Sequence, residues 1–118
     1  MRLSIVLIFT LLPMPAMALD AEKMSPLVRT YYQCMMQQSA NYGKRTERAD
    51  EAIEAARSAC QQQREDLRVD IAAEHAADEI MKGRQPNEYQ VNRLASSILS
   101  KIEERFRPDL TRSALDAK

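Results

Sequence analysis

The sequence is poor in the residues on which most catalytic and nucleotide-binding motifs depend. It contains two glycines and one histidine among 118 residues. A phosphate-binding loop needs several glycines, and the single histidine, His75, is not accompanied by a recognisable serine-nucleophile motif. We therefore expect that the protein is not an enzyme, and that it has no catalytic residues and no bound cofactor.

Large apolar side chains are also scarce. From Leu19 to the end of the chain, Leu, Ile, Val and Phe make up 16 of 100 residues. Such a low content predicts disorder when the net charge is high, but here the formal net charge is zero and alanine is abundant. The composition therefore favours an ordered helical domain with a thin core. The balanced charge gives no electrostatic drive toward nucleic acid.

The first 18 residues have the pattern of a secretory signal peptide. One basic residue precedes an apolar run over residues 3–12, and the small residues Ala16 and Ala18 precede the predicted cleavage site. A membrane anchor is the competing interpretation, but the run is much shorter than the roughly 20 residues of a spanning helix. We expect an exported protein, periplasmic or secreted, with no stable membrane insertion after cleavage and a single domain over residues 19–118.

Glycine and proline divide this domain into three segments of helical composition. Helices are predicted over residues 26–42, 46–82 and 87–106. Pro108 is expected to end the third helix, because proline disfavours helical geometry in the residue before it. The last residues, 109–118, are then expected to form a poorly ordered tail.

The longest segment changes its apolar face part-way along its length. At 100° per residue, one stripe comprises Ala49, Ile53, Ala56, Cys60, Leu67 and Ile71. The stripe on nearly the opposite side comprises Val69, Ala72, Ala73, Ala76 and Ile80. We predict an all-α, three-helix arrangement in which the first helix covers the former stripe and the third folds back to cover the latter. A break within residues 61–66, which would give a more compact bundle, is the alternative.

The two cysteines are placed to staple the first two helices together. Cys34 and Cys60 lie on apolar stripes, and the midpoint between them falls close to the turn expected at residues 41–45. An antiparallel hairpin therefore brings them level, and an exported protein meets oxidising conditions. We predict an intramolecular Cys34–Cys60 disulfide; buried free thiols and an intermolecular bridge are the alternatives.

Two groups of side chains resemble metal ligands without completing a site. Cys34, Met35 and Met36 are soft ligands suited to Cu(I), but consecutive helical residues point about 100° apart and cannot converge on one ion. His75 and Glu79 share a helix face, but no third ligand is near them in the sequence. We expect no metal site at either place.

Carboxylates are plentiful, and two of them, in Asp78–Lys82 and Glu103–Arg107, are followed by a base four residues later. Pairs at this spacing lie on one helix face and stabilise a solvated helix. We therefore expect these acids to be surface ion-pair partners rather than catalytic acids.

The function suggested by these features is that of a structural or protein–protein interaction module. Tyr32, Met36 and Leu99 lie off the main apolar stripes and are the residues that we expect to form an interaction surface. Such a surface suits a homodimer or an unidentified protein partner. A small-ligand or soft-metal carrier of the cell envelope is the alternative function.

Overall fold

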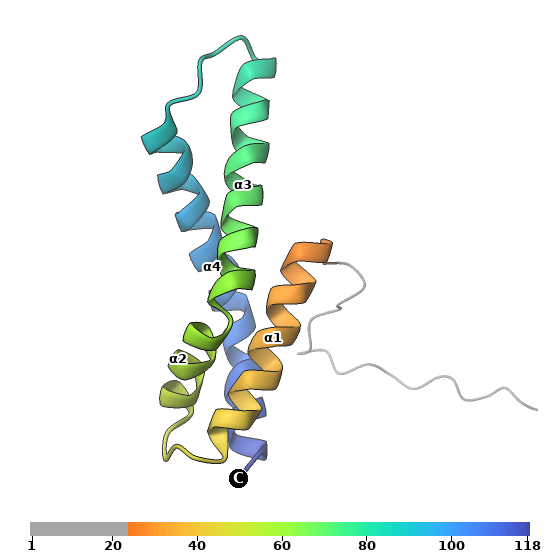
Figure 1. Ribbon diagram of the computed structural model, residues 1–118, viewed down its shortest axis with the longest axis vertical. Coiled ribbons are helices and arrows are strands. Elements are labelled where there is room, and N and C mark those ends of the chain that lie inside the picture. Colours follow the sequence, from red (N-terminus) through yellow and green to blue (C-terminus); the bar gives the residue numbers. More distant parts are fainter. Residues whose placement is uncertain (1–23) are drawn as a thin grey trace, which may run out of the picture.

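The computed structural model describes residues 24–118, which form four α-helices and contain no strand (Figure 1). Helix α1 spans Pro26–Gly43, α2 spans Ala49–Ala59, α3 spans Gln61–Met81 and α4 spans Glu88–Asp116. The predicted all-α fold is confirmed. The predicted signal peptide, residues 1–18, lies outside the described residues.

Helices α1 and α2 form the predicted antiparallel hairpin. Ser25 caps the start of α1 by accepting a hydrogen bond from the backbone N–H of Val28, and Pro26 occupies the first turn, where its missing N–H leaves no helical bond unmade. The Cys34–Cys60 disulfide joins the hairpin, with 6.0 Å between the two Cα atoms. The predicted staple is therefore confirmed.

The predicted single helix over residues 46–82 is wrong, because it is interrupted at Cys60. This residue has φ −102° and ψ 24°, outside helical geometry, although its N–H still bonds to the carbonyl of Ala56 and its carbonyl to the N–H of Arg64. The break precedes the alternative break predicted within residues 61–66 by one position. It redirects the chain, so that α2 lies against α1 while α3 runs up beside α4 (Figure 1).

Helix α4 continues through Pro108, so the predicted helix end and the predicted tail over 109–118 are wrong. Proline removes one hydrogen bond and crowds the carbonyl one turn earlier, but Pro108 is exposed, where water can solvate that carbonyl. The residues that follow bury Leu110 and Ala114 against the other helices. Their burial compensates for the proline and extends α4 to Asp116. As a result, α4 packs against α1 as well as against α3.

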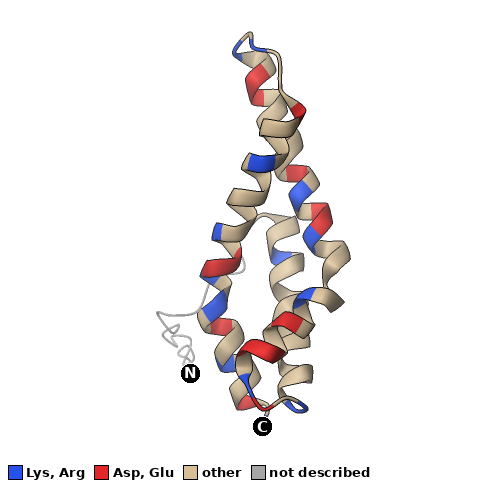
Figure 2. Cartoon of the chain, turned by 90° about the vertical axis from the view of Figure 1, so that its left-hand side faces the viewer, with Lys and Arg blue, Asp and Glu red and all other residues tan. Residues whose placement is uncertain are grey.

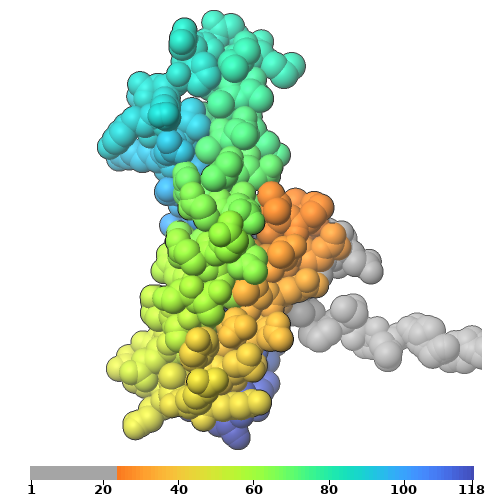
Figure 3. Space-filling view, viewed as in Figure 1, coloured from red at the N-terminus to blue at the C-terminus, as the bar shows by residue number. Residues whose placement is uncertain are grey.

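The packing divides the molecule into a dense part and a sparse part. Where all four helices meet, the core contains fully or almost fully buried large side chains: Tyr31, Met35, Ile53, Leu67, Leu99, Phe106 and Leu110. Above the N-terminal end of α1, the α3–α4 hairpin continues without a third helix beside it (Figures 1 and 3). We call residues 69–95 the arm; within it only Val91 and Ala95 are buried.

Removing the disulfide should destabilise the fold strongly. Replacing both cysteines, Cys34→Ala with Cys60→Ala, frees a loop whose closure contributes about 3.5 kcal/mol in the chain-entropy model. We expect a melting temperature lower by about 15 °C in thermal unfolding monitored by circular dichroism. Adding a reductant should lower the melting temperature of the wild-type protein and leave that of the double variant unchanged. Equal melting temperatures for the two oxidised proteins would contradict the prediction.

Gly43 should be intolerant of even one added methyl group. The last turn of α1 lies so close to α4 that a Cβ atom at position 43 would overlap the backbone carbonyl of Ala114. Because backbone cannot rotate away as a side chain does, Gly43→Ala should cost about 1–3 kcal/mol in urea unfolding. Gly83→Ala is a useful comparison: Gly83 has φ +79° but open space around it, so its cost is conformational alone. An unchanged stability for Gly43→Ala would disprove the close approach.

Candidate functional site

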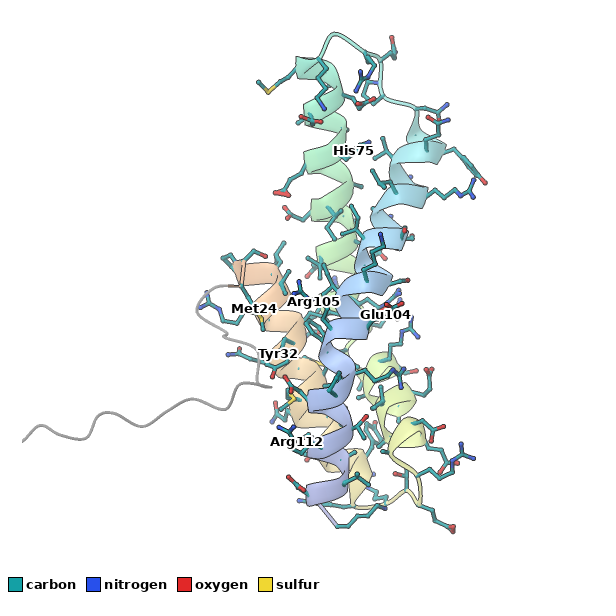
Figure 4. All side chains as sticks on the ribbon, turned by 180° about the vertical axis from the view of Figure 1, so that it is seen from behind. Met24, Tyr32, His75, Glu104, Arg105 and Arg112 are labelled. Carbon is teal, nitrogen blue, oxygen red and sulfur yellow. A yellow bond between two sulfur atoms is a disulfide. The ribbon has the colours of Figure 1, made fainter. Side chains whose placement is uncertain are left out.

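Two of the three residues predicted to form an interaction surface are core residues. Leu99 is completely buried. Tyr32 is 9% exposed, its ring packs edge-on against Phe106 and its hydroxyl donates a hydrogen bond of 2.8 Å to Asp109 Oδ2. Figure 4 shows Tyr32 on α1, facing the lower half of α4. The expectation that they are free for a partner is therefore wrong. The part of α4 beyond Pro108 covers Tyr32 on α1, and Leu99, which belongs to α4, is buried in the core.

Met36, the third predicted residue, is half-buried at the edge of the same contact. Its backbone carbonyl accepts a hydrogen bond of 3.0 Å from the Ser113 hydroxyl of α4. A shallow groove of about 530 Å³ runs beside it between the ends of α1 and α4. Its lining includes Tyr32, Met36, Lys44, Asp109 and Arg112.

In the structure, Cys34 and Met35 of the sequence Cys34-Met35-Met36 are engaged in the fold. The Cys34 sulfur is bonded to Cys60, so no thiolate is available, and Met35 is buried in the core. Within residues 24–118, no group of three or more His, Cys, Asp or Glu side chains is arranged to hold a metal ion. His75 and Glu79 likewise gain no third ligand there, and Glu79 pairs with Arg84 instead.

The Glu103 carboxylate is the point at which all four helices meet. It projects from α4 and accepts a 2.5 Å hydrogen bond from the Tyr31 hydroxyl of α1. Arg57 of α2 donates to it at 3.2 Å, and the Nε atom of Arg64 on α3 donates at 2.7 Å. The side chain is 17% exposed, so these bonds form largely out of water. Charge-assisted hydrogen bonds of this kind are stronger than neutral ones.

The surroundings of Glu103 fix its charge state. Burial by itself would raise its pKa, but the hydrogen bonds from Arg64 and Tyr31 and the positive charges of Arg64 and Arg57 outweigh burial and hold the pKa below its ordinary value. Burial, followed by the hydrogen bond to Glu103, raises the pKa of Tyr31. Burial and the hydrogen bond to Asp109 raise the pKa of Tyr32 to about 12. The carboxylate is thus ionised and both hydroxyls are protonated at neutral pH.

The predicted partner of Glu103 is wrong, because its ion pairs are with Arg57 and Arg64. The predicted surface pair with Arg107 is absent among the ion pairs of the described residues, whereas the predicted Asp78–Lys82 pair is present at 2.9 Å. One signal was available: Glu103 lies four residues after Leu99 and three before Phe106, at the border of the apolar face of α4. An acid at such a border faces the neighbouring helices as much as the solvent.

The arm carries the exposed apolar surface. Six large apolar side chains of residues 24–118 are exposed, and five of them belong to the arm: Val69, Ile80, Met81, Tyr89 and Leu94. A groove of about 400 Å³ runs along one side of the seam between α3 and α4. It is lined by Val69, Ala72, Ala73, Ala76, Pro86, Glu88, Val91 and Asn92. The arm therefore offers an accessible, mostly apolar helical surface.

Comparisons with protein-family models, with curated proteins and with solved structures give no match to this chain. Within the described part of the chain, no helix combines the length and the apolar character that crossing a membrane requires. The described residues offer two candidate features: Glu103, which joins the four helices, and the arm, which presents the accessible apolar surface.

Glu103→Gln should reveal the contribution of the four-helix junction. A neutral amide leaves Arg64 without its counter-charge, so we expect a loss of about 2 kcal/mol in urea unfolding at neutral pH. Because the folded-state pKa of Glu103 is lowered, its contribution is present above the ordinary value of 4.5 and is lost as the pH falls through the folded-state pKa. The difference between variant and wild type should therefore shrink in acid.

Glu104→Gln is the matched control. Glu104 is the next residue on α4 and is exposed (Figure 4), so this variant should stay within about 0.5 kcal/mol of the wild type. Equal effects of the two substitutions, or an effect of Glu103→Gln that does not change between neutral and acid pH, would contradict the role assigned to Glu103.

Proposed function

We propose that this protein is an exported, non-enzymatic interaction module whose arm docks against an apolar helical surface of another polypeptide chain. The main observation in support is the concentration of exposed large apolar side chains in the arm. Exposed apolar residues that are scattered singly over a surface are normal. Exposed apolar residues that are concentrated in one part of a molecule are typical of a protein-binding surface.

Export, to the periplasm or the medium, is supported by two independent features. The first 18 residues have the charge, apolar run and small residues of a secretory signal. The Cys34–Cys60 disulfide is of a kind that persists in oxidising compartments and is rare where thiols are kept reduced.

The division of the molecule supports docking through the arm. The four-helix part buries its large apolar residues and is held by the disulfide and by Glu103. The arm has two helices and a core of small residues, so it gains more from being covered than the four-helix part does. A projecting pair of helices can add its apolar side to a partner helix, as in a helical bundle.

A structural role for the principal carboxylate supports a non-enzymatic function. Glu103 is engaged by a tyrosine and two arginines, and its lowered pKa removes it from the range useful to a general acid near neutral pH. Its interactions hold helices together and leave the carboxylate committed to the fold.

Site-specific photo-cross-linking in the producing cells tests the proposal. A benzophenone amino acid is introduced at position 73, an exposed arm residue, and separately at position 59, an exposed residue of α2 outside the arm. We expect illumination to give a discrete covalent protein adduct from position 73 and none from position 59. The adduct is detected as a band of higher mass in a blot of the fractionated cells.

Both positions carry alanine in the wild type, so the change in side chain is the same in the two variants. No adduct from position 73, or the same adducts from both positions, would contradict docking through the arm. Recovery of the protein only in the cytoplasm, with its leader uncleaved, would contradict export.

A further inference from the structure

The exposed side of α3 carries a regular pattern that α4 does not cover. Positions at successive spacings of four, three, four, three and four residues form what we call the α3 stripe: Gln62, Asp66, Val69, Ala73, Ala76 and Ile80. All are exposed except Ala76, which is half-buried. This spacing is the a/d pattern by which one helix pairs with another over several turns. Leu67 and Ile71, which pack into the core, lie on a different side of α3.

We propose that the α3 stripe binds the α3 stripe of a second copy of this chain, with the two helices antiparallel and the two-fold axis level with residues 74 and 75. The inference rests on the proposed function, because it names the polypeptide that the arm binds. In this register Ala73 lies opposite Ala76 of the second copy, and Val69 lies opposite Ile80 of the second copy.

The residue sizes suit this register. Alanines at the centre allow two helix backbones to approach closely, and Ala72 and Ala77 flank them with equally small side chains. The larger Val69 and Ile80, exposed by 51% and 62%, then meet at both ends of the alanine centre. Because the axis is two-fold, each apolar contact is formed twice.

The distribution of charge selects the antiparallel orientation. Asp66 and Asp70 are exposed near the lower end of the stripe, and Lys82 and Arg84 follow the upper end of α3, close to Asp78 and Glu79. Figure 2 shows basic residues at the tip of the arm with acidic residues just below them. Antiparallel pairing brings Asp66 of one copy level with residues 82–84 of the other, which include Lys82 and Arg84. Parallel pairing would instead place Asp66 against Asp66. Lys82 and Arg84 pair with Asp78 and Glu79 within the chain, but their side chains remain 55% and 59% exposed and keep donors free.

The predicted dimer is reversible. The stripe is about 27 Å long, so one helix pair covers less than the roughly 800 Å² per copy of a standard stable interface. Val69, Ala73 and Ala76 of the stripe also line the groove, and its other lining residues, among them Ala72, Val91 and Asn92, provide further contact for the second copy. We therefore expect monomer and dimer to be in equilibrium over an accessible concentration range.

Analytical ultracentrifugation of the oxidised protein without its predicted leader tests self-association. The wild type should shift from the mass of one chain to that of two as the concentration rises. Ala73→Glu should raise the dissociation constant at least about tenfold, because it buries an unpaired carboxylate at the centre of the interface. Ala59→Glu makes the same change on α2 and should leave the constant within about twofold of the wild type.

Since position 73 is exposed and glutamate is a good helix former, far-UV circular dichroism should show Ala73→Glu to be folded. A wild type that keeps the mass of one chain at every concentration would overturn the proposal. Equal effects of Ala73→Glu and Ala59→Glu would also overturn it.

Cross-linking tests the orientation. Chains carrying Val69→Cys and Ile80→Cys are mixed in equal amounts without reductant, which leaves the Cys34–Cys60 disulfide intact, and are treated with a short bifunctional maleimide. The antiparallel register predicts a cross-linked dimer in the mixture and little from either variant alone. Dimers formed as readily by each variant alone would overturn the register, because they indicate parallel pairing.

Different results would contradict self-association and docking through the arm. A protein that is monomeric in the ultracentrifuge but forms an arm-specific adduct with a different protein in cells refutes the second copy and retains the docking function. The absence of any adduct from position 73 refutes the docking function itself.

Discussion

The Glu103 carboxylate is the interaction on which the arrangement of the helices depends. A single charged group, mostly removed from water, receives hydrogen bonds from Tyr31, Arg57 and Arg64, which belong to the three other helices. A charge in such a place is costly unless its partners are held in position, so any displacement of a helix leaves a charge unpaired. The apolar core supplies most of the driving force, and this junction selects one relative placement of the four helices.

The junction also explains why the molecule has two parts of different character. The disulfide, the close approach of Gly43 to Ala114 and the tilted and edge-on ring contacts around Phe106 all lie in the four-helix part. Beyond it, α3 and α4 continue as a pair whose contacts involve alanine and valine. Small side chains bury little area, so the arm is the part with most to gain from a partner. A well-packed four-helix part that carries an arm with few buried side chains suits a protein that binds a partner through the arm.

The proposed self-association follows from this division. The α3 stripe keeps its apolar residues exposed because α4 packs on a neighbouring side of α3 and because the N-terminal end of α1 lies below the arm (Figures 1 and 3). The sequence pattern predicted an interaction surface at Tyr32, Met36 and Leu99, whereas the exposed large apolar residues lie mostly in the arm. The physical reason is that α4 covers Tyr32 and part of Met36, and that Leu99 of α4 packs into the core.

The sequence by itself determined that the chain is helical, where the α1 helix lies and that Cys34 pairs with Cys60, since these depend mainly on local rules. Capping at Ser25, the 3.6-residue apolar period and the position of the turn between Cys34 and Cys60 predict the hairpin without knowledge of distant contacts. Only the tertiary structure decided the break at Cys60, the passage of α4 through Pro108 and the partners of Glu103. The bonds from Tyr31 and Tyr32 to α4 join residues 72 and 77 positions apart. Contacts between residues so far apart in the sequence override the local preference of a proline or of an i,i+4 ion pair. The reason is that buried contacts contribute more to the stability of the fold than either local preference does.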